Sequence, residues 1–487
     1  MMQDHPLYPR QLEHIPHCWI DGAGQTGSGA ARSLIDPALG RGFAEVSDAD
    51  TSQVEQAVAS AKTALPRWAD TLPADRAGVL FRLAELLEKN ADRLAAVESL
   101  NAGKPISQAK RDVGRAADYF RFYAGACDKL NGESIPLGSD QTAFTVLEPV
   151  GVTAHILPWN YPVSTLARGA APALAAGATV VAKPSELTPL TTILTAELAS
   201  EAGLPAGVFN VVTGAGGIGE ALASHKDVAH VTFTGSTATG RKIMQSASKP
   251  VAGTTLELGG KSPVVVLADA DLDAAAAGVA RGIFFNAGQV CAAGARLICD
   301  ASVHDKLIEK VIAKAKAMTI GHGLDDPDLG PLISAAQLER VQGFVDRAKE
   351  DGLNCVTGGH MACPEGLADG YFYAPTVFAD VPADAEIARQ EVFGPVLVTQ
   401  TCQSAEEALE LANGTAFGLV AGIYTADTTQ ALGFARKAEA GQVFVNGFLK
   451  GGDTLPFGGV KESGIGREKG LAGLSAYCAI KSIVLNH

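Results

Sequence analysis

Two residues able to do covalent chemistry lie in the middle of the chain, each close to glycines. Glu257 ends a short apolar run and is followed by Gly259 and Gly260, which leave the backbone room to approach a ligand. A carboxylate there can act as a general base if burial raises its pKa. Cys291 stands just past a predicted helix, in a loop with Gly288, and a partly exposed cysteine with a lowered pKa supplies a thiolate nucleophile. The simpler alternatives are an exposed loop carboxylate and a small buried apolar side chain.

Two further polar turns follow predicted strands. Asn160 lies in the run Pro158–Pro162, where two prolines fix the turn and an amide can donate a hydrogen bond to an oxyanion. Lys183 and Glu186 follow the next strand. Because neighbouring βα turns of one sheet can share a crevice, these three side chains are candidates to face one ligand. An ordinary turn asparagine is the simpler alternative for Asn160.

Glycine is abundant, with 54 residues in 487, and two clusters mark strand-to-helix turns. Gly214–Gly219 has the spacing of a dinucleotide-binding turn, but the acid that such a fingerprint needs about 20 residues later is missing. Phe233–Gly240 also runs from a strand into a helix, whose free N–H groups favour an anion. Either cluster can hold a pyrophosphate, and spacing alone does not choose between them.

The hydrophobic pattern predicts an α/β protein. Residues 51–130 have the apolar spacing of helices, and residues 131–141 read as a hairpin or arm. From Gly151 the pattern predicts a parallel, doubly wound sheet. Its strands are predicted at Val152–Leu157, Thr179–Ala182, Phe209–Val212, His230–Phe233 and Thr255–Leu258, and its helices at Ser164–Ala176, Thr191–Glu201, Gly217–Ser224 and Thr239–Ala247. A second α/β domain has predicted strands at Val264–Leu267, Ala295–Cys299, Thr376–Phe378, Val396–Thr401 and Gln442–Asn446, and helices at Leu272–Phe284, Val303–Ala317 and Glu406–Ala412.

Composition narrows the class of protein. The formal net charge is 39 − 53 = −14, which argues against a broad nucleic-acid or acidic-membrane surface. No apolar run is long enough for a transmembrane helix, and the N-terminus lacks the pattern of a secretory signal. The eight scattered cysteines form no C-x-x-C pair, so neither a zinc site nor a disulfide scaffold is expected. A cytoplasmic protein without a metal is therefore the expectation.

Together, and in this order, the motifs resemble those of the aldehyde dehydrogenase superfamily, from about Pro16 to the C-terminus. The most specific matches are L-E-L-G-G-K-S-P, which contains Glu257, and F-x-x-x-G-Q-x-C, which ends at Cys291, 34 residues later. Five more motifs agree: P-W-N at Pro158–Asn160, K-P-S-E at Lys183–Glu186, F-T-G-S at Phe233–Ser236, E-x-F-G-P at Glu391–Pro395 and P-F-G-G-x-K-x-S-G at Pro456–Gly464.

The resemblance implies an NAD-dependent oxidation of an aldehyde to a carboxylic acid. Cys291 would attack the carbonyl carbon, and the Asn160 amide with the Cys291 N–H would hold the oxyanion. Glu257 would activate the water that hydrolyses the resulting thioester. A CoA-acylating enzyme is less consistent, because such relatives usually lack the base at Glu257. A non-catalytic homologue would be expected to have lost one of these three residues.

The resemblance also implies a cofactor site. It favours the second glycine cluster for the pyrophosphate and makes the first a turn near the cofactor. The residues implied to bind the cofactor are Ile156, Trp159, Lys183, Ser185, Glu186, Gly216, Phe233, Gly235, Ser236, Leu258, Glu391 and Phe393. A carboxylate at Glu186 would repel a 2′-phosphate, so NAD is expected rather than NADP.

Arg168 carries the hypothesis about the substrate. Relatives that act on succinate semialdehyde or on benzaldehyde and vanillin resemble this chain in having arginine there, and a guanidinium can pair with a substrate carboxylate. A carboxylate-bearing or aromatic aldehyde is the expectation; an amino-aldehyde, betaine-type or broad-specificity enzyme is the alternative. Glu468 is either a second glutamate near the water path or a structural ion-pair partner of an arginine, and Arg168 itself is equally explained by a structural salt bridge. Weaker candidates for an apolar substrate channel are Tyr161, Phe285, Val290, Ala292 and Phe448.

The domain boundaries follow from the same resemblance. Residues 1–130 and 144–258 would form the Rossmann-like NAD-binding domain and 259–446 the catalytic domain. Residues 131–143 and 470–487 would form a small β oligomerisation arm, and 447–469 a glycine-rich segment that returns to the first domain. A C-terminal strand that completes a neighbour's sheet would give a homodimer or homotetramer.

Overall fold

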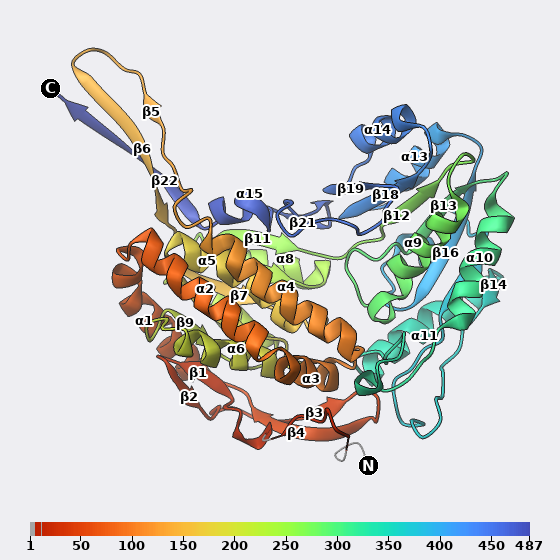
Figure 1. Ribbon diagram of the computed structural model, residues 1–487, viewed down its shortest axis with the longest axis horizontal. Coiled ribbons are helices and arrows are strands. Elements are labelled where there is room, and N and C mark those ends of the chain that lie inside the picture. The colour runs from red at the N-terminus through yellow and green to blue at the C-terminus, as the bar shows by residue number, and fades with distance from the viewer. Residues whose placement is uncertain (1–4, 11) are drawn as a thin grey trace.

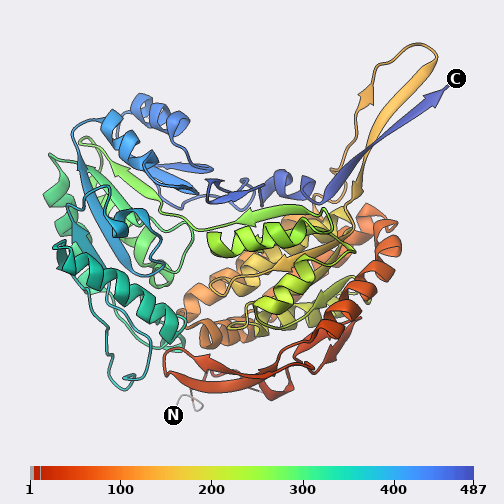
Figure 2. The same ribbon diagram turned by 180° about the vertical axis from the view of Figure 1, so that it is seen from behind.

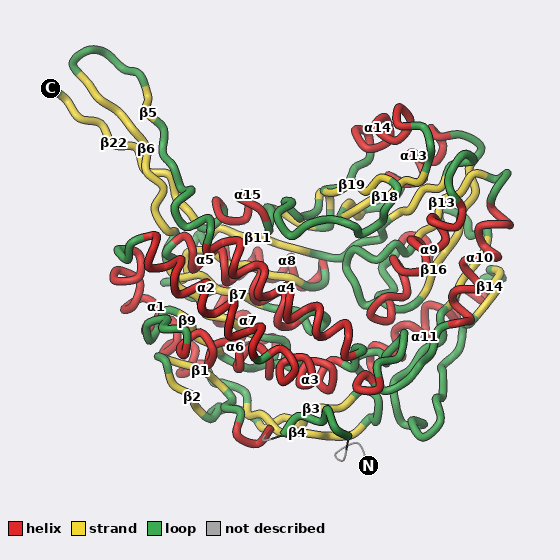
Figure 3. The backbone as a smooth tube through the Cα atoms, in the orientation of Figure 1, coloured by secondary structure: helices red, strands yellow, loops and turns green. Residues whose placement is uncertain are grey.

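The computed structural model describes residues 5–10 and 12–487; residues 1–4 and 11, which the sequence assigns to the NAD-binding domain, lie outside the described residues. Two α/β lobes lie side by side, and a long β arm projects from the first (Figures 1 and 2). In each lobe helices flank the strands (Figure 3). The mixed α/β fold with two largely parallel sheets confirms the predicted fold class.

Four helices precede the first parallel sheet, as the apolar spacing predicts. The Asp50 side chain caps the first by accepting a hydrogen bond from the N–H of Gln53, and the second begins at Pro73, where a missing N–H costs little. The third ends at Gly103, whose left-handed φ of 76° suits glycine. Their bounds are α1 Thr51–Ala69, α2 Pro73–Lys89, α3 Ala91–Ala102 and α4 Ile106–Ala124.

The first sheet contains the five predicted parallel strands in the order β9-β8-β7-β10-β11. The sequence run that predicts each strand is apolar and β-branched, and these strands are buried on both faces, as parallel strands between helices must be. The bounds are β7 Val152–Ile156, β8 Thr179–Lys183, β9 Phe209–Val211, β10 Val228–Thr234 and β11 Gly253–Glu257, with α5 Pro162–Ala176, α6 Leu190–Glu201, α7 Gly216–Ala223 and α8 Thr237–Ala247 between them.

Short antiparallel strands extend this sheet on both sides, and the sequence pattern gives no sign of them. One edge is formed from the N-terminal segment and the other from a two-residue strand near the C-terminus, so the sheet has eight strands. A separate hairpin packs nearby. The bounds are β1 Cys18–Ile20, β2 Ala23–Gln25, β21 Gly464–Ile465 and, for the hairpin, β3 Ala31–Asp36 and β4 Arg41–Ser47.

The second lobe has a seven-stranded sheet in the order β14-β15-β16-β13-β12-β18-β19. Its strands are β12 Pro263–Val266, β13 Arg296–Asp300, β14 Asn354–Thr357, β15 Thr376–Ala379, β16 Val396–Cys402, β18 Val420–Tyr424 and β19 Gln442–Val445. Its helices are α9 Leu272–Phe284, α10 His304–Ala317, α11 Ala335–Glu350, α12 Glu386–Arg389, α13 Ala405–Asn413 and α14 Thr428–Lys437. The sequence pattern predicted five of these strands and missed β14 and β18.

The arm is larger than the sequence indicates. β6 (Gln141–Pro149) pairs along its whole length with β22 (Cys478–Asn486), and β5 (Ser134–Ile135) adds a third strand. The predicted boundary at residue 143 therefore falls inside β6, because strand pairing with a distant segment extends the arm to Pro149. Residues 470–475 form α15 (Gly470–Ser475), which packs on α5 rather than joining the arm.

The segment 447–469 runs from β19 of the second sheet to β21 of the first. It pairs β20 (Val460–Lys461) with β17 (Phe417–Gly418) and then places β21 beside β11, the strand that ends at Glu257. No helix among the described residues is long and apolar enough to cross a membrane. All eight cysteines are free. No cluster of His, Cys, Asp and Glu within residues 5–10 and 12–487 is suited to hold a metal ion.

Candidate active site

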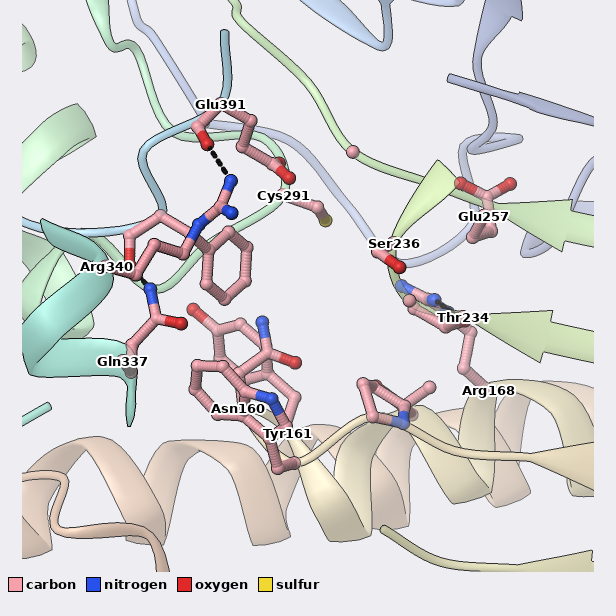
Figure 4. A pocket seen from close by; sticks show the side chains of 16 residues that line it. Asn160, Tyr161, Arg168, Thr234, Ser236, Glu257, Cys291, Gln337, Arg340 and Glu391 are labelled. Carbon is pink, nitrogen blue, oxygen red and sulfur yellow. Dashed lines mark hydrogen bonds between the residues drawn. The ribbon is translucent and has the colours of Figure 1, made fainter. Parts of the chain in front are cut away.

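Two cavities meet at Cys291. The first, of about 290 Å³, is lined by residues of both lobes, and Figure 4 shows its side chains. The second, of about 200 Å³, is lined by residues of α4, α5 and α9, by the Cys291 loop and by part of the segment 442–469. Tyr161, Thr165, Arg168 and Cys291 belong to both walls. The thiol can therefore be approached from two sides.

The loop that carries Cys291 is conformationally strained. After α9 the chain makes a 3₁₀ turn over Phe285–Gly288, in which Asn286 and Ala287 adopt left-handed φ angles of 51° and 53°. Non-glycine residues rarely adopt this conformation, and such strain clusters at functional sites. The Gln289 side chain holds the loop, because its Oε1 accepts a hydrogen bond from the N–H of Ile333 at 2.9 Å.

The predicted lowering of the Cys291 pKa is wrong for the free protein. Burial, opposed by Arg168 and reinforced by the carboxylates of Glu257 and Glu391, raises the pKa of the thiol to about 11. The sequence shows a loop that a partly exposed cysteine can occupy, but it does not show that two acids lie nearby. At neutral pH the thiol is protonated, and its proton must leave before Sγ can attack a carbonyl.

Glu257 has the environment of a general base. It is the last residue of β11 and is 1% exposed, and among the described residues neither of its carboxyl oxygens has a hydrogen-bond partner. Burial and then the negative charge of Glu468 raise its pKa well above the usual value. A carboxylate with a raised pKa is a stronger base towards water, as the sequence analysis requires.

Glu468 forms a buried ion pair with Arg168, through its Oε2 and the Arg168 Nε. Their side chains are 3% and 11% exposed, and Arg168 also donates a hydrogen bond from Nη2 to Thr234 Oγ1 at 3.2 Å. The structure thus shows the structural salt bridge that stood as the alternative reading of both residues. The guanidinium lies in the cavity wall already neutralised, so pairing with a substrate carboxylate stays a prediction for Arg168.

Asn160 lies in the wall of the first cavity, at the turn before α5. Its Nδ2 donates a hydrogen bond to the backbone oxygen of Gln289 at 2.8 Å, two residues before Cys291. An amide nitrogen carries two hydrogens, so one stays available to an oxyanion formed beside Cys291. The bond to the cysteine loop fixes the direction in which that second hydrogen points.

Lys104 supports Asn160, and the sequence analysis missed it. Its Nζ donates hydrogen bonds to the Asn160 backbone oxygen at 2.8 Å, Asp112 Oδ2 at 2.6 Å and Glu98 Oε1 at 3.2 Å. The ammonium group also lies 4.6 Å from the centre of the Tyr161 ring. A fully buried lysine persists only when such partners compensate the lost hydration. No short-range pattern reveals the cluster, because Asn160 is distant from Lys104 in the sequence.

The two glycines after Glu257 make room for protein groups. A Cβ atom at Gly259 would lie 2.6 Å from Glu391 Oε2, and one at Gly260 would lie 2.5 Å from the Cys291 backbone oxygen. The Gly260 N–H donates to Glu391 Oε1 at 2.9 Å. Burial nevertheless raises the pKa of Glu391 to about 7. The glycines thus let the backbone hold the Glu391 carboxylate beside the nucleophile.

The residues around Glu391 shape the other end of the first cavity. Arg340 and Gln337, both on α11, donate hydrogen bonds to the backbone oxygens of Glu391 at 2.6 Å and Phe393 at 2.8 Å (Figure 4). Phe393 has a left-handed φ of 62°, and its ring meets that of Trp159 edge-on at 5.3 Å. The result is a narrow, aromatic-walled space next to a carboxylate. Arg340 and Gln337 are further residues that the sequence analysis did not identify.

The start of α8 opens into this cavity. Ser236 caps the helix by accepting a hydrogen bond from the Thr239 N–H at 3.3 Å, and Gly235 and Ser236 line the wall. The remaining N–H groups of the first turn favour an anion. A dinucleotide fits this set of groups: N–H donors for a pyrophosphate, a carboxylate for ribose hydroxyls and aromatic walls for a flat ring.

Five residues predicted to bind the cofactor line this cavity: Trp159, Gly235, Ser236, Glu391 and Phe393. The other seven lie outside its wall, at the ends of neighbouring strands or turns of the first sheet: Ile156, Lys183, Ser185, Glu186, Gly216, Phe233 and Leu258. Lys183 donates to the backbone oxygen of Gly214 at 2.5 Å and lies 3.8 Å from the half-exposed carboxylate of Glu186. Lys183 thus joins the turns that follow β8 and β9, and neither Lys183 nor Glu186 lines the cavity that contains Asn160.

The second cavity contains four of the residues proposed for a substrate channel: Tyr161, Phe285, Val290 and Ala292. Phe448 does not belong to the channel. It is 2% exposed, and its ring fills the space that Cβ atoms at Gly282, Gly294 and Gly422 would need. It is a core residue of the second lobe, because three glycines from distant segments leave a hole that an aromatic ring fills.

Comparison with known proteins identifies the family. A sequence model of the aldehyde dehydrogenase family matches residues 25–483. The hydroxyisobutyraldehyde dehydrogenase of Mycolicibacterium austroafricanum is 42% identical over 462 residues, which are 94% of this chain and 91% of that protein. The chain belongs to the aldehyde dehydrogenase family.

Solved structures agree with this assignment. An indole-3-acetaldehyde dehydrogenase in complex with NAD⁺ is 40% identical, with a TM-score of 0.95 over 97% of each chain. The betaine aldehyde dehydrogenase of Staphylococcus aureus in complex with NAD⁺ is 36% identical, with a TM-score of 0.95 over 98% of this chain and 95% of that one. Each is a protein to which this chain is similar along nearly its whole length.

Proposed function

We propose that the protein oxidises an aldehyde to a carboxylic acid with NAD, through a thioester on Cys291. The observation that carries the proposal is the convergence of Cys291, Glu257 and Asn160 on the wall of one cavity, next to a donor set that fits a dinucleotide. Family membership supplies the reaction class, and the geometry supports a role for each residue.

The oxidation half of the reaction uses Cys291 and Asn160. The Sγ proton passes to water, Sγ bonds to the aldehyde carbon, and the carbonyl oxygen becomes an oxyanion that Asn160 Nδ2 and the Cys291 N–H stabilise. A bound NAD would supply the acceptor for the hydride of that carbon, and its positive charge would favour the thiolate. Re-forming the carbonyl as the hydride leaves gives a thioester on Sγ. A preorganised oxyanion donor contributes about 10²–10³ in rate.

The hydrolytic half uses Glu257. Its carboxylate takes a proton from water, the hydroxide adds to the thioester carbon, and the C–S bond breaks. The proton on Glu257 then passes to the leaving thiolate, which gives the acid and the free thiol and restores the carboxylate. General-base assistance contributes about 10²–10⁴ in rate. The presence of this base supports hydrolysis rather than acyl transfer to CoA.

We infer NAD rather than NADP from Glu186. The Glu186 side chain is 37% exposed beside Lys183, at the edge where the adenosine ribose would lie. A carboxylate there repels a 2′-phosphate and accepts hydrogen bonds from ribose hydroxyls. Comparable kcat/KM values for the two cofactors would contradict this assignment.

For the substrate we propose a carboxylate-bearing or aromatic aldehyde. The apolar side chains of Phe285, Val290 and Ala292 in the second cavity suit an apolar body. The relatives named for betaine aldehyde, indole-3-acetaldehyde and hydroxyisobutyraldehyde supply the competing classes. A quaternary ammonium aldehyde is disfavoured, because basic side chains outnumber acidic ones in this wall.

We propose that the arm makes the protein a homodimer or homotetramer. β22 is an edge strand with exposed apolar side chains, among them Ile480, Val484 and Leu485 at 73%, 49% and 50%. Such an edge pairs readily with another chain. Light scattering of the protein and of a variant truncated after residue 477 tests this: the full chain should be at least dimeric and the variant should have a smaller mass.

NADH absorbance with a panel of aldehydes tests the function. The wild type should produce NADH and acid without CoA, Cys291→Ser should produce neither, and Glu257→Gln should release one NADH per subunit in a burst and then stop. NADH formation that needs CoA, or that survives in Cys291→Ser, would contradict the proposal. Cys363→Ser is the matched control, because Cys363 is exposed and outside both cavities.

A further inference from the structure

The second cavity is basic in an acidic protein. Its wall contains five basic side chains, Arg111, Arg115, Arg168, Arg281 and Lys469, and two acidic ones, Asp112 and Asp453. The chain as a whole carries a formal net charge of −14. The net charge of the side chains in this wall is therefore opposite in sign to the net charge of the whole chain.

Ion pairs account for part of this charge. Asp112 is bound by Lys104 at 2.6 Å, and Arg168 is bound by Glu468. Asp453 is shared, with its Oδ1 lying 3.3 Å from Arg115 Nε and 3.8 Å from Lys469 Nζ. Both acids of the wall are thus committed to cations of the protein and cannot neutralise others.

Arg111 and Arg281 are the basic side chains of this wall that form no ion pair with the described residues. Within residues 5–10 and 12–487, no carboxylate lies within ion-pair distance of either guanidinium. Arg111, on α4, lies with its guanidinium carbon 5.3 Å from the centre of the Phe285 ring. Arg281, on α9, belongs to the same cavity wall as Phe285, which lies just past the end of that helix. Two exposed cations from different helices, α4 and α9, therefore stand in one cavity wall without a carboxylate partner among the described residues.

The part of the cavity next to the nucleophile has a different character. Val290 and Ala292 flank Cys291 in the chain, and Phe285 and Phe457 add aromatic surface. An aldehyde that reaches Sγ through this cavity places its body against apolar side chains. The wall also contains the two unpaired guanidinium groups, so an anionic far end of that aldehyde would find positive charge in the same cavity.

We propose that Arg111 and Arg281 determine specificity for an aldehyde that carries an anionic group, a carboxylate, at the end remote from the carbonyl. This inference rests on the proposed function and identifies the residues that choose its substrate. Guanidinium groups bind carboxylates with short, charge-assisted hydrogen bonds. The role differs from the one first expected of Arg168, whose charge Glu468 already neutralises.

Matched substrates test the inference. Benzaldehyde is compared with 4-carboxybenzaldehyde and with 4-(trimethylammonio)benzaldehyde, and hexanal with 6-oxohexanoate, by NADH formation. In at least one pair the wild type should use the carboxylate at least tenfold better, in kcat/KM, than the neutral aldehyde. The cationic aldehyde should be the poorest of its series. Added salt should lower kcat/KM for the anionic aldehyde much more than for the neutral one.

Variants assign the effect to the two arginines. Arg111→Gln and Arg281→Gln should each lower kcat/KM for the preferred anionic aldehyde about tenfold, chiefly through KM, and for its neutral partner less than threefold. Arg281→Glu should reverse the order of the anionic and cationic aldehydes. Arg436→Gln is the matched control, because Arg436 is an exposed helical arginine that lines neither cavity, and it should change neither value.

Three results decide between the hypotheses. Oxidation of neutral aldehydes with no preference for a carboxylate overturns the inference and leaves the proposed function standing. Equal losses for anionic and neutral aldehydes in the glutamine variants also overturn it, since they indicate a structural role. Failure to oxidise any aldehyde overturns the proposed function, and the inference with it.

Discussion

The buried ion pair between Arg168 and Glu468 allows a sharp prediction. In Glu468→Gln the guanidinium of Arg168 stays in the cavity wall without its carboxylate. Removing one partner of a buried pair costs about 3–5 kcal/mol, because the other charge stays desolvated. Arg168 keeps its hydrogen bond to Thr234, and its side chain is 11% exposed, so we expect the lower end, about 3 kcal/mol of unfolding free energy.

The same change should alter catalysis. Glu468 raises the pKa of Glu257 and Arg168 lowers it, so removing the first and freeing the second both lower that pKa. The group that must be deprotonated to activate water then loses its proton at lower pH. The acidic limb of the pH–rate profile for thioester hydrolysis should move to lower pH, which single-turnover and steady-state kinetics on one substrate can measure.

A double-mutant cycle separates pairing from other effects. Arg168→Met, Glu468→Gln and the double variant are compared by denaturant unfolding. The loss of unfolding free energy in the double variant should be smaller than the sum of the losses in the two single variants. The exposed pair Arg347–Glu386 is the control, with side chains 49% and 45% exposed, and Glu386→Gln should cost less than about 1 kcal/mol. Additivity within about 0.5 kcal/mol at Arg168 and Glu468, or an unshifted pH profile, would refute the reasoning.

Three further outcomes are expected. Without cofactor, alkylation of Cys291 by iodoacetamide should accelerate about tenfold per pH unit through neutral pH and level off only near its pKa of about 11, as peptide mass spectrometry can follow; a plateau near pH 7 would contradict the assigned burial. Asn160→Ala should lower kcat about 10²–10³-fold with little change in cofactor affinity, and an undiminished kcat would remove it from the oxyanion site. Lys104→Met should destabilise the protein by about 3–5 kcal/mol in thermal or denaturant unfolding, since Glu98 and Asp112 lose their buried cation; a loss below about 1 kcal/mol would show that the cluster is not structural.

Much of the fold could be predicted because its signals are local. Apolar runs predicted the five parallel strands of the first sheet to within two residues at each end, since strands buried on both faces leave continuous β-branched segments, and the bounds of α9 were predicted to the residue. The short strands β1, β2 and β21 left no such trace. They form because the unpaired backbone groups at the edges of the sheet bond to segments from distant parts of the chain. Two or three residues are too few to show a hydrophobic pattern.

The candidate site also has residues whose positions the sequence indicates and one candidate, Phe448, whose burial it does not indicate. Glu257, Cys291 and Asn160 stand in turns whose glycines and prolines are visible in the sequence, and the structure brings all three to one cavity. Phe448 is a weaker channel candidate in the sequence, but the structure buries it in the core of the second lobe. Its burial depends on three glycines contributed by different elements, which no reading along the chain can align.

The sequence by itself determined which residue types stand at strand ends and turns, and hence the family and the candidate nucleophile and base. Tertiary structure alone decided the state of those groups. The thiol pKa of about 11, the pairing of Arg168 with Glu468 and the freedom of Arg111 and Arg281 all depend on which charges packing brings together. Electrostatic interactions act through space and grow as water is excluded, so their outcome follows from proximity and burial rather than from order along the chain.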